Sequence, residues 1–261
     1  MSARTSSPSR HGFAVVTGGA KRVGAVFAKA LAADGWFVRL HYNGSTVAAE
    51  ATAAAIRADG GRCDLVQADL ANPDVAERIL APAGEAGFAS LLVNSASIFD
   101  YDTAASVTAA HLAHNYAINA TAPILLSKAF AVQLPEAKRG LIVNLLDQKL
   151  VNLNPDFFSY TLSKVALGAA TTMLAQALAP RIRVNGIAPG ITLPSSDQTD
   201  EEFAKAQAKT PLGYGSTPDD LVQALRYLIA AEAVTGQTVI VDGGQSLNPS
   251  PRDVMYIVRG E

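Results

Sequence analysis

The tyrosine and lysine of Tyr160-Thr161-Leu162-Ser163-Lys164 are the residues best suited to proton transfer. A spacing of four places both side chains on one face of a helix. An ammonium group beside a phenol favours the phenolate, so the lysine is expected to lower the tyrosine pKa from about 10 toward neutrality. Many surface helices carry the same pair, so the pair gains meaning only from the residues around it.

A glycine-rich turn, Thr17-Gly18-Gly19-Ala20-Lys21-Arg22-Val23-Gly24, follows the first apolar run and precedes a helical pattern. Such a turn lets backbone N–H groups and the positive end of a helix meet a pyrophosphate. A plain structural turn produces similar letters. The position between a strand and a helix is what favours a dinucleotide site.

The residues after the second strand indicate which dinucleotide is bound. Asn43, Gly44 and Ser45 stand where an NAD enzyme carries an acidic residue for the ribose 2′-hydroxyl, and Arg22 could instead pair with a 2′-phosphate. NADP is therefore favoured over NAD. The alternatives are that Arg22 and Lys21 are solvated and that Ser45 caps the next helix. Asp69-Leu70 fits an adenine-contacting corner or a helix cap.

Composition excludes several other classes of function. The 261 residues include 21 basic and 23 acidic side chains, a net charge of −2, and 49% hydrophobic residues, which suffices for a buried core. A near-neutral chain has no field to attract nucleic acid or a membrane surface. One cysteine and four scattered histidines predict neither disulfides nor a metal site. Without an apolar leader or spanning segment, we expect a cytoplasmic protein.

Short β-branched runs alternate with alanine-rich helical stretches, which predicts βαβ units. The expected fold is α/β, a single Rossmann domain over residues 11–261 with a doubly wound, seven-stranded parallel sheet and helices on both faces. Residues 1–10 are expected to form a flexible tail, and residues 190–218 a substrate loop. The expected strands are 13–16, 37–41, 63–67, 91–94, 141–145, 183–187 and 238–241, and the expected helices include 23–34, 46–59, 73–86, 111–133 and 157–179.

Taken together, these motifs resemble those of classical short-chain dehydrogenases/reductases. The matching segments occur in the family's order and cover about residues 13 to 244: TGGAKRVG from residue 17, Asp69, NSAS from 94, Asn119 in HNYAINAT, YTLSK from 160, VNGIAPG from 184 and VDGG from 241.

The resemblance implies a role for each matched residue. Tyr160 would donate the proton, Lys164 would bind the nicotinamide ribose and lower the tyrosine pKa, and Asn119 would help hold a relay water. Without the family, Asn119 would be taken as a helix-interior residue bonding backbone. NADP(H) is the implied cofactor, and its implied contacts are Gly18, Lys21, Arg22, Val23, His41, Asn43, Ser45, Asp69, Leu70, Asn94, Ala96, Ser97, Tyr160, Lys164, Pro189, Gly190 and Thr192.

Three departures from the usual family pattern resemble the pteridine reductase branch. Arg22 replaces a glycine, NSAS replaces NNAG, and Asp147 replaces the serine thirteen residues before the tyrosine. A carboxylate would repel the oxyanion that develops in ketone reduction, whereas a carboxylic acid can relay a proton to a ring nitrogen or bind an amino group. The implied catalytic residues are Asp147, Tyr160, Lys164 and Asn119, and the implied substrate contacts are Ser97, Phe99, Asp147, Tyr160 and Leu193.

This resemblance implies an NADPH-dependent reductase of dihydropterin, dihydromonapterin or dihydrofolate type substrates. Phe99 would stack the pterin against the nicotinamide, although a core phenylalanine explains it almost as well. Gly44 stands where the protozoal enzymes carry an arginine, which leaves Arg22, Ser45 and His41 for the 2′-phosphate. The alternatives are a carbonyl or 3-oxoacyl reductase, an NADP-binding regulatory protein, and a degenerate enzyme in which Asp147 only caps a loop.

The resemblance also bears on assembly. The family commonly forms homotetramers through the helices that carry Asn119 and Tyr160, and we expect one here. In the pteridine reductase branch a C-terminal segment reaches a neighbour's active site, so Arg252 or Arg259 is expected to do likewise. Tyr256-Ile257-Val258 predicts a strand-like segment at such a contact.

Overall fold

Seven parallel strands form one sheet in the order β3-β2-β1-β4-β5-β6-β7, which confirms the predicted fold class. The computed structural model describes residues 12–195 and 198–260, so the predicted tail over residues 1–10 lies outside the described residues. The strand bounds are β1 Phe13–Val16, β2 Phe37–Tyr42, β3 Arg62–Gln67, β4 Ala89–Asn94, β5 Gly140–Leu145, β6 Ile182–Pro189 and β7 Thr238–Val241.

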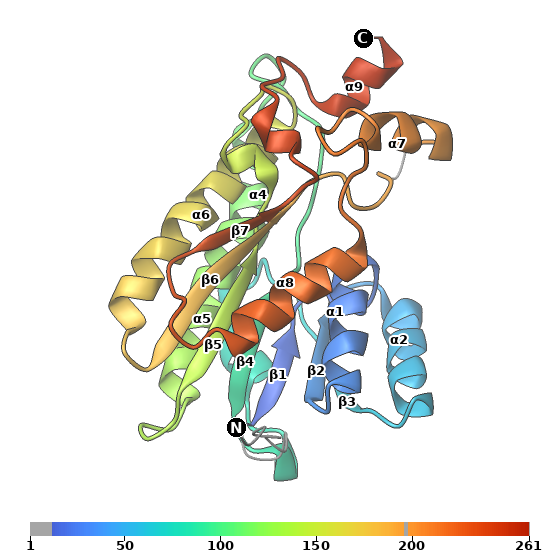
Figure 1. The fold of residues 1–261 in the computed structure, drawn as a ribbon. Coiled ribbons are helices and arrows are strands. Elements are labelled where there is room, and N and C mark those ends of the chain that lie inside the picture. Colours follow the sequence, from blue (N-terminus) through green and yellow to red (C-terminus); the bar gives the residue numbers. More distant parts are fainter. Residues whose placement is uncertain (1–11, 196–197, 261) are drawn as a thin grey trace.

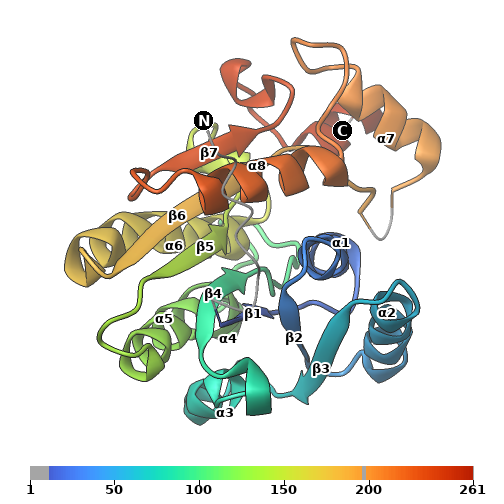
Figure 2. The same cartoon turned by 60° about the horizontal axis from the view of Figure 1, so that its bottom comes forward.

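Helices cover both faces of this sheet, as Figures 1 and 2 show. Side chains alternate along each strand, so Ala14 and Val16 pack into one core while Phe13 and Val15 pack into the other. The first core is covered by α1 (Arg22–Ala33), α2 (Thr46–Ala58) and α8 (Pro218–Ala230). The second is covered by α3 (Ala76–Leu80), α5 (Ala122–Gln133) and α6 (Phe158–Leu178), with α4 (Ala109–Tyr116) packed against α6.

Two expected helices are interrupted. The stretch expected as 111–133 consists of α4, a π-helical turn over Ala117–Thr121, and α5. The stretch expected as 73–86 contains only a short α3 between two 3₁₀ turns. Its helix stops at Ala81, whose backbone is extended (ψ 146°) because the following proline, Pro82, disfavours the helical region.

Two helices lie where a loop or a strand was predicted. Helix α7 (Asp200–Gln207) lies inside the expected substrate loop and begins with a capping box between Thr199 and Glu202. Helix α9 (Val254–Arg259) replaces the strand-like segment expected around Tyr256. Asp253 caps its first turn, and Gly260 ends it with φ 78°.

All seven strands point their carboxyl ends to the same edge of the sheet. The strand order reverses between β1 and β4, which opens a crevice at that edge. Helices α7 and α9 lie above this edge in Figure 1. Within the described residues, no helix is long and apolar enough to cross a membrane.

A glycine substitution tests the close contact between α1 and the turn before it. A Cβ on Gly24 would lie 2.2 Å from the backbone oxygen of Gly18, so Gly24→Ala should lower the free energy of unfolding by about 1–3 kcal/mol. Gly44→Ala is the matched control, because a Cβ there meets nothing within 4 Å. Denaturant unfolding measures both variants, and equal losses would contradict the packing argument.

Candidate active site

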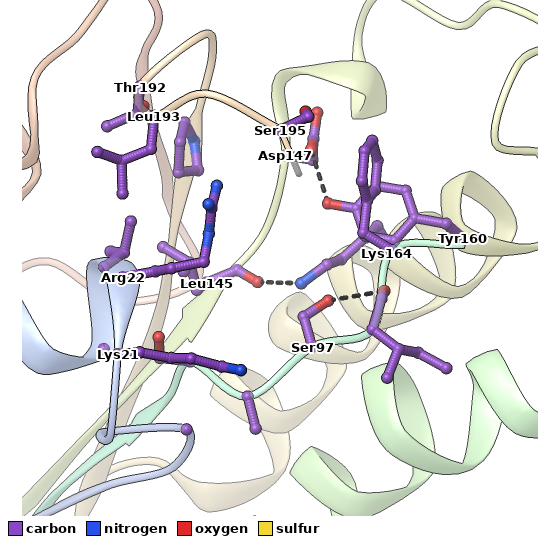
Figure 3. Close-up of a pocket in the computed structure, with 18 of the residues that line it drawn as sticks. Lys21, Arg22, Ser97, Leu145, Asp147, Tyr160, Lys164, Thr192, Leu193 and Ser195 are labelled. Atoms are coloured by element: carbon purple, nitrogen blue, oxygen red, sulfur yellow. Dashed lines mark hydrogen bonds between the residues drawn. The ribbon is translucent and has the colours of Figure 1, made fainter. Parts of the chain in front are cut away.

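A cavity of about 480 Å³ lies at the carboxyl edge of the sheet. Figure 3 shows Asp147, Tyr160 and Lys164 on one side of it and Lys21 and Arg22 across from them. All the predicted site residues except Asn94 and Asn119 line this cavity: Gly18, Lys21, Arg22, Val23, His41, Asn43, Ser45, Asp69, Leu70, Ala96, Ser97, Phe99, Asp147, Tyr160, Lys164, Pro189, Gly190, Thr192 and Leu193.

Tyr160 and Asp147 form a direct hydrogen bond in this cavity. The Tyr160 hydroxyl donates to Asp147 Oδ2 over 2.7 Å, and Asp147 Oδ1 accepts from the backbone N–H of Lys149 over 2.9 Å. Tyr160 lies in the first turn of α6, and Asp147 lies on the turn that follows β5. Two segments of the chain thus bring the phenol and the carboxyl group together.

Burial raises the pKa of both groups, and their hydrogen bond raises that of Tyr160 while it lowers that of Asp147. Burial raises the pKa of Asp147 above its usual value, because the charged form loses its hydration. Burial and then the Asp147 charge raise the pKa of Tyr160 well above 10. The expectation that Lys164 lowers the tyrosine pKa is therefore wrong for this arrangement: the carboxyl group contacts the phenol, whereas the Lys164 ammonium lies 5.7 Å from the ring centre.

Lys164 lies one helical turn after Tyr160, as the spacing predicts. Its ammonium donates to the backbone oxygen of Leu145 at the end of β5 over 2.7 Å. Burial lowers its pKa to about 8, with the charge of Asp147 opposing that shift. The side chain is therefore mostly charged at neutral pH and loses its charge within the mildly alkaline range.

The two predicted residues outside the cavity lining, Asn119 and Asn94, lie in the interior. Asn119, in the π-helical turn, accepts from the backbone N–H of Ile98 over 2.9 Å and donates to Ser163 Oγ over 3.0 Å. It ties the loop after β4 to the helix that carries Lys164. Asn94 donates to Asn144 Oδ1 over 2.8 Å. Neither residue lines the cavity, and both amides instead bond to neighbouring segments of the chain.

The glycine turn forms a cradle suited to a phosphate group. Gly18 (φ 63°) lies so close to the loop after β4 that an added Cβ would be 2.8 Å from Ala96 Cα. Lys21, at the start of α1, makes no side-chain capping bond, and the first turn carries no acidic residue. The amides at this helix start therefore face the cavity without a carboxylate competing for them.

His41 and Arg22 both have backbone partners. The His41 Nδ1 accepts from the N–H of Gly18 over 3.3 Å, and its Nε2 lies 3.0 Å from the oxygen of Ala68. Burial lowers the His41 pKa, so the ring is neutral near pH 7 and serves to hold the glycine turn. Arg22 donates to the oxygen of Pro194 over 2.9 Å and so joins this turn to the loop after β6.

Aromatic rings cover one wall of the cavity. Phe99 stacks on Phe157 with 3.9 Å between ring centres, and its ring meets that of Tyr160 edge-on at 4.6 Å. Phe157, the N-cap residue of α6, has a left-handed backbone (φ 54°), a conformation that costs energy for a residue other than glycine. Phe99 is 42% exposed, so it is not the ordinary core phenylalanine considered above.

Sequence reasoning missed the C-terminal contribution to the cavity. Asp253, Val254 and Met255 line it. The two arginines expected to reach a neighbour are paired within the chain: Arg252 with Asp156 at 2.8 Å and Arg259 with Glu202 of α7 at 2.9 Å. An aspartate cap before a short apolar stretch is the one sequence signal for this helix. Gln148, Lys149, Ser195, Gln198 and Gln245 are further lining residues that were not predicted.

The chain is similar to several known proteins over most of its length. A family model described as "Enoyl-(Acyl carrier protein) reductase" matches residues 18–246. Two similar solved structures are FolM Alternative dihydrofolate reductase 1 from Brucella suis, in complex with NADP, and its counterpart from Brucella canis, also with NADP. The first is 42% identical, with a TM-score of 0.87, and the match covers 91% of this chain and 96% of that chain. The second is 40% identical, with a TM-score of 0.86, and the match covers 93% and 96%.

A curated relative belongs to a more distant group. Pteridine reductase 1 from Leishmania tarentolae is 32% identical over 290 residues, which cover 93% of this chain and 99% of that protein. The family model and these relatives each match most of the chain, and the relatives match over nearly their own full length. This chain therefore belongs to the short-chain dehydrogenase/reductase family of oxidoreductases.

Proposed function

We propose that this protein is an NADPH-dependent reductase of pterins, of the dihydropterin, dihydromonapterin or dihydrofolate type. The observation that carries the proposal is the 2.7 Å hydrogen bond between Tyr160 and a buried Asp147. The similar Brucella proteins are named as alternative dihydrofolate reductases, and the Leishmania relative as a pteridine reductase. Both names fit a site that supplies a proton to a ring nitrogen.

The phosphate cradle supports NADP(H) as the cofactor, and the Brucella structures contain NADP. When bound, NADPH supplies the hydride. The uncapped start of α1 would hold the pyrophosphate, and Lys21, Arg22 and Ser45 line the cavity where a 2′-phosphate would lie. Lys164 would bind the nicotinamide ribose through its ammonium.

Asp147 and Tyr160 deliver the proton together. In the structure the phenol donates to the carboxylate. When Asp147 is protonated, the direction of this hydrogen bond reverses: Asp147 donates to Tyr160, and the tyrosine proton is free to point into the cavity. The phenol then passes its proton to a ring nitrogen of the substrate while it takes one from Asp147. Tyr160 never becomes a phenolate, which its raised pKa would oppose.

This geometry disfavours the ketone or 3-oxoacyl alternative. Ketone reduction needs a neutral donor that stabilises a developing oxyanion, and the raised pKa of Asp147 provides such a donor only while the proton is present. An ionised Asp147 would repel the oxyanion that develops when hydride reaches a carbonyl carbon. A protonated Asp147 can instead pass its proton through Tyr160 to a ring nitrogen.

The remaining parts of the proposal concern substrate contacts and assembly. Phe99, Ser97 and Leu193 line the cavity and would contact the pterin. Exposed apolar side chains on α5 and α6, including Val132 and Met173, would pack between subunits of a homotetramer. Gel filtration with light scattering measures that assembly, and a monomer at micromolar concentration would contradict it.

Turnover assays test the proposed substrate class. NADPH oxidation, followed by absorbance, should be rapid with dihydropterins or dihydrofolate and slower with NADH as the reductant. A 3-oxoacyl thioester is the competing substrate. Faster turnover of the thioester would overturn the pterin assignment, and binding of NADPH without turnover of any substrate would indicate a regulatory protein.

Asp147→Asn and Asp147→Ser test the proton delivery. Each removes the acid that returns a proton to Tyr160, so kcat for the pterin should fall about 10²- to 10⁴-fold. The Kd of NADPH should change little. Asp100→Asn is the control, because Asp100 is an exposed aspartate that does not line the cavity. Retained or increased pterin turnover in the Asp147→Ser variant would contradict the role of Asp147.

Arg22→Gln tests the selection of the 2′-phosphate. Loss of a charge-assisted hydrogen bond costs about 1.5–3 kcal/mol, so the KM for NADPH should rise roughly tenfold or more, and the KM for NADH should not. Arg62→Gln, which removes an exposed arginine on β3, should leave both values unchanged. An equal loss for NADPH and NADH would place Arg22 at the pyrophosphate or the substrate instead.

A further inference from the structure

Lys149 is a buried charged residue that the proposed mechanism does not use. Its side chain is only 3% exposed, and its ammonium lies 2.8 Å from Asp253 Oδ2 and 2.9 Å from Asn154 Oδ1. Burying an ammonium group is costly unless a counter-charge and hydrogen bonds accompany it. The C-terminal segment supplies that counter-charge as Asp253.

The backbone of the same residue holds the catalytic carboxyl group. Lys149 stands two positions after Asp147, and its N–H donates to Asp147 Oδ1 over 2.9 Å. A single residue therefore links Asp147, through its backbone, to Asp253, through its side chain. A change in the position of the Lys149 side chain is transmitted to the short turn that orients Asp147.

Asp253 itself is held in place by several bonds. Its backbone N–H donates to Asp156 Oδ2 over 2.7 Å, and Arg252 pairs with the same carboxylate at 2.8 Å. Asp253 Oδ1 accepts from the N–H of Met255 over 3.1 Å and so caps α9. The carboxylate that faces Lys149 thus has a fixed position at the cavity wall.

We propose that Asp253 is a positioning residue for proton delivery: acting through Lys149, it fixes the turn that presents Asp147 to Tyr160 and holds the Lys149 ammonium away from the Asp147 carboxyl group. The effect of Asp253 on catalysis rests on the proposed function. The geometric link between Asp253, Lys149 and Asp147 exists whatever the substrate is.

Charges from each surrounding element act on Asp147. Lys164 and the Tyr160 hydroxyl face it from α6, and Lys149 acts on it from its own turn. Asp253 of the C-terminal segment pairs with Lys149, and its negative charge raises the Tyr160 pKa. Both ammonium groups lower the Asp147 pKa, against the larger effect of burial. Without Asp253, the Lys149 ammonium would lose its counter-charge and act more strongly on Asp147.

Two substitutions should therefore change the Asp147 titration in opposite directions. Asp253→Asn keeps the volume and the helix cap but frees the ammonium, so the Asp147 pKa should fall by about one unit. Lys149→Met removes the ammonium and keeps its packing, so the Asp147 pKa should rise. The double variant should behave like Lys149→Met, because Asp253 acts through Lys149.

Carbon-13 NMR of the aspartate carboxyl groups measures this titration without any substrate, with Asp147→Asn used to assign the signal. Arg252→Gln is the control, because it loosens the same segment without removing the partner of Lys149. It should leave the Asp147 titration unchanged. Should Asp253→Asn fail to fold, the double variant, which buries no unpaired ammonium, still tests the direction expected for Lys149→Met.

The pH profile of kcat for the pterin gives the functional measurement. Activity needs protonated Asp147, so its alkaline limb should move to lower pH in Asp253→Asn and to higher pH in Lys149→Met, with little change in KM. Shifts of the same sign in the two variants, no shift in either, or an equal shift in Arg252→Gln would overturn the proposal. Opposite NMR shifts without pterin turnover would support the positioning role and refute the proposed function.

Discussion

The contact between Asp147 and Tyr160 depends on the parallel order of the strands. Because β5 ends at the same edge as β1, β4 and β6, the turn after β5 faces the glycine turn, and α6 begins beside both. The side chains proposed to deliver a proton and the helix end suited to a phosphate group therefore share one cavity. An antiparallel strand at the position of β5 would place Asp147 at the opposite edge of the sheet, far from the cofactor cradle.

The interior network is as important as the lining. Asn119 and Ser163 connect the loop after β4 to α6, and His41 holds the glycine turn through two backbone contacts. None of these groups needs to touch a ligand. Each removes conformational freedom from a segment that does line the site. The entropy of ordering the site is therefore lost on folding and not again on binding.

Local sequence signals were sufficient for the sheet, and the family resemblance pointed to about half of the residues that line the cavity. The strand runs and the helices of the βαβ units follow from periodicity, and the spacing of Tyr160 and Lys164 places them on one helical face. The tyrosine pKa could not be predicted in this way, because it depends on a contact with Asp147 and on burial, neither of which spacing encodes. Lys149 and Asp253 escaped prediction for the same reason: they are 104 positions apart in the chain, yet their side chains are 2.8 Å apart.

Glu202 serves two helices at once. One of its carboxylate oxygens accepts from the backbone N–H of Thr199 and completes the cap of α7, and the other pairs with Arg259 of α9. The hydrogen bonds to Arg259 and Thr199 lower the Glu202 pKa to about 2, so this link persists throughout the physiological pH range. Helix α7 cannot unwind its first turn without disturbing its bond to the C-terminal helix. The loop after β6 and the segment that carries Asp253 are thus mechanically coupled, so a displacement of either helix would also strain the support of the proposed proton donor.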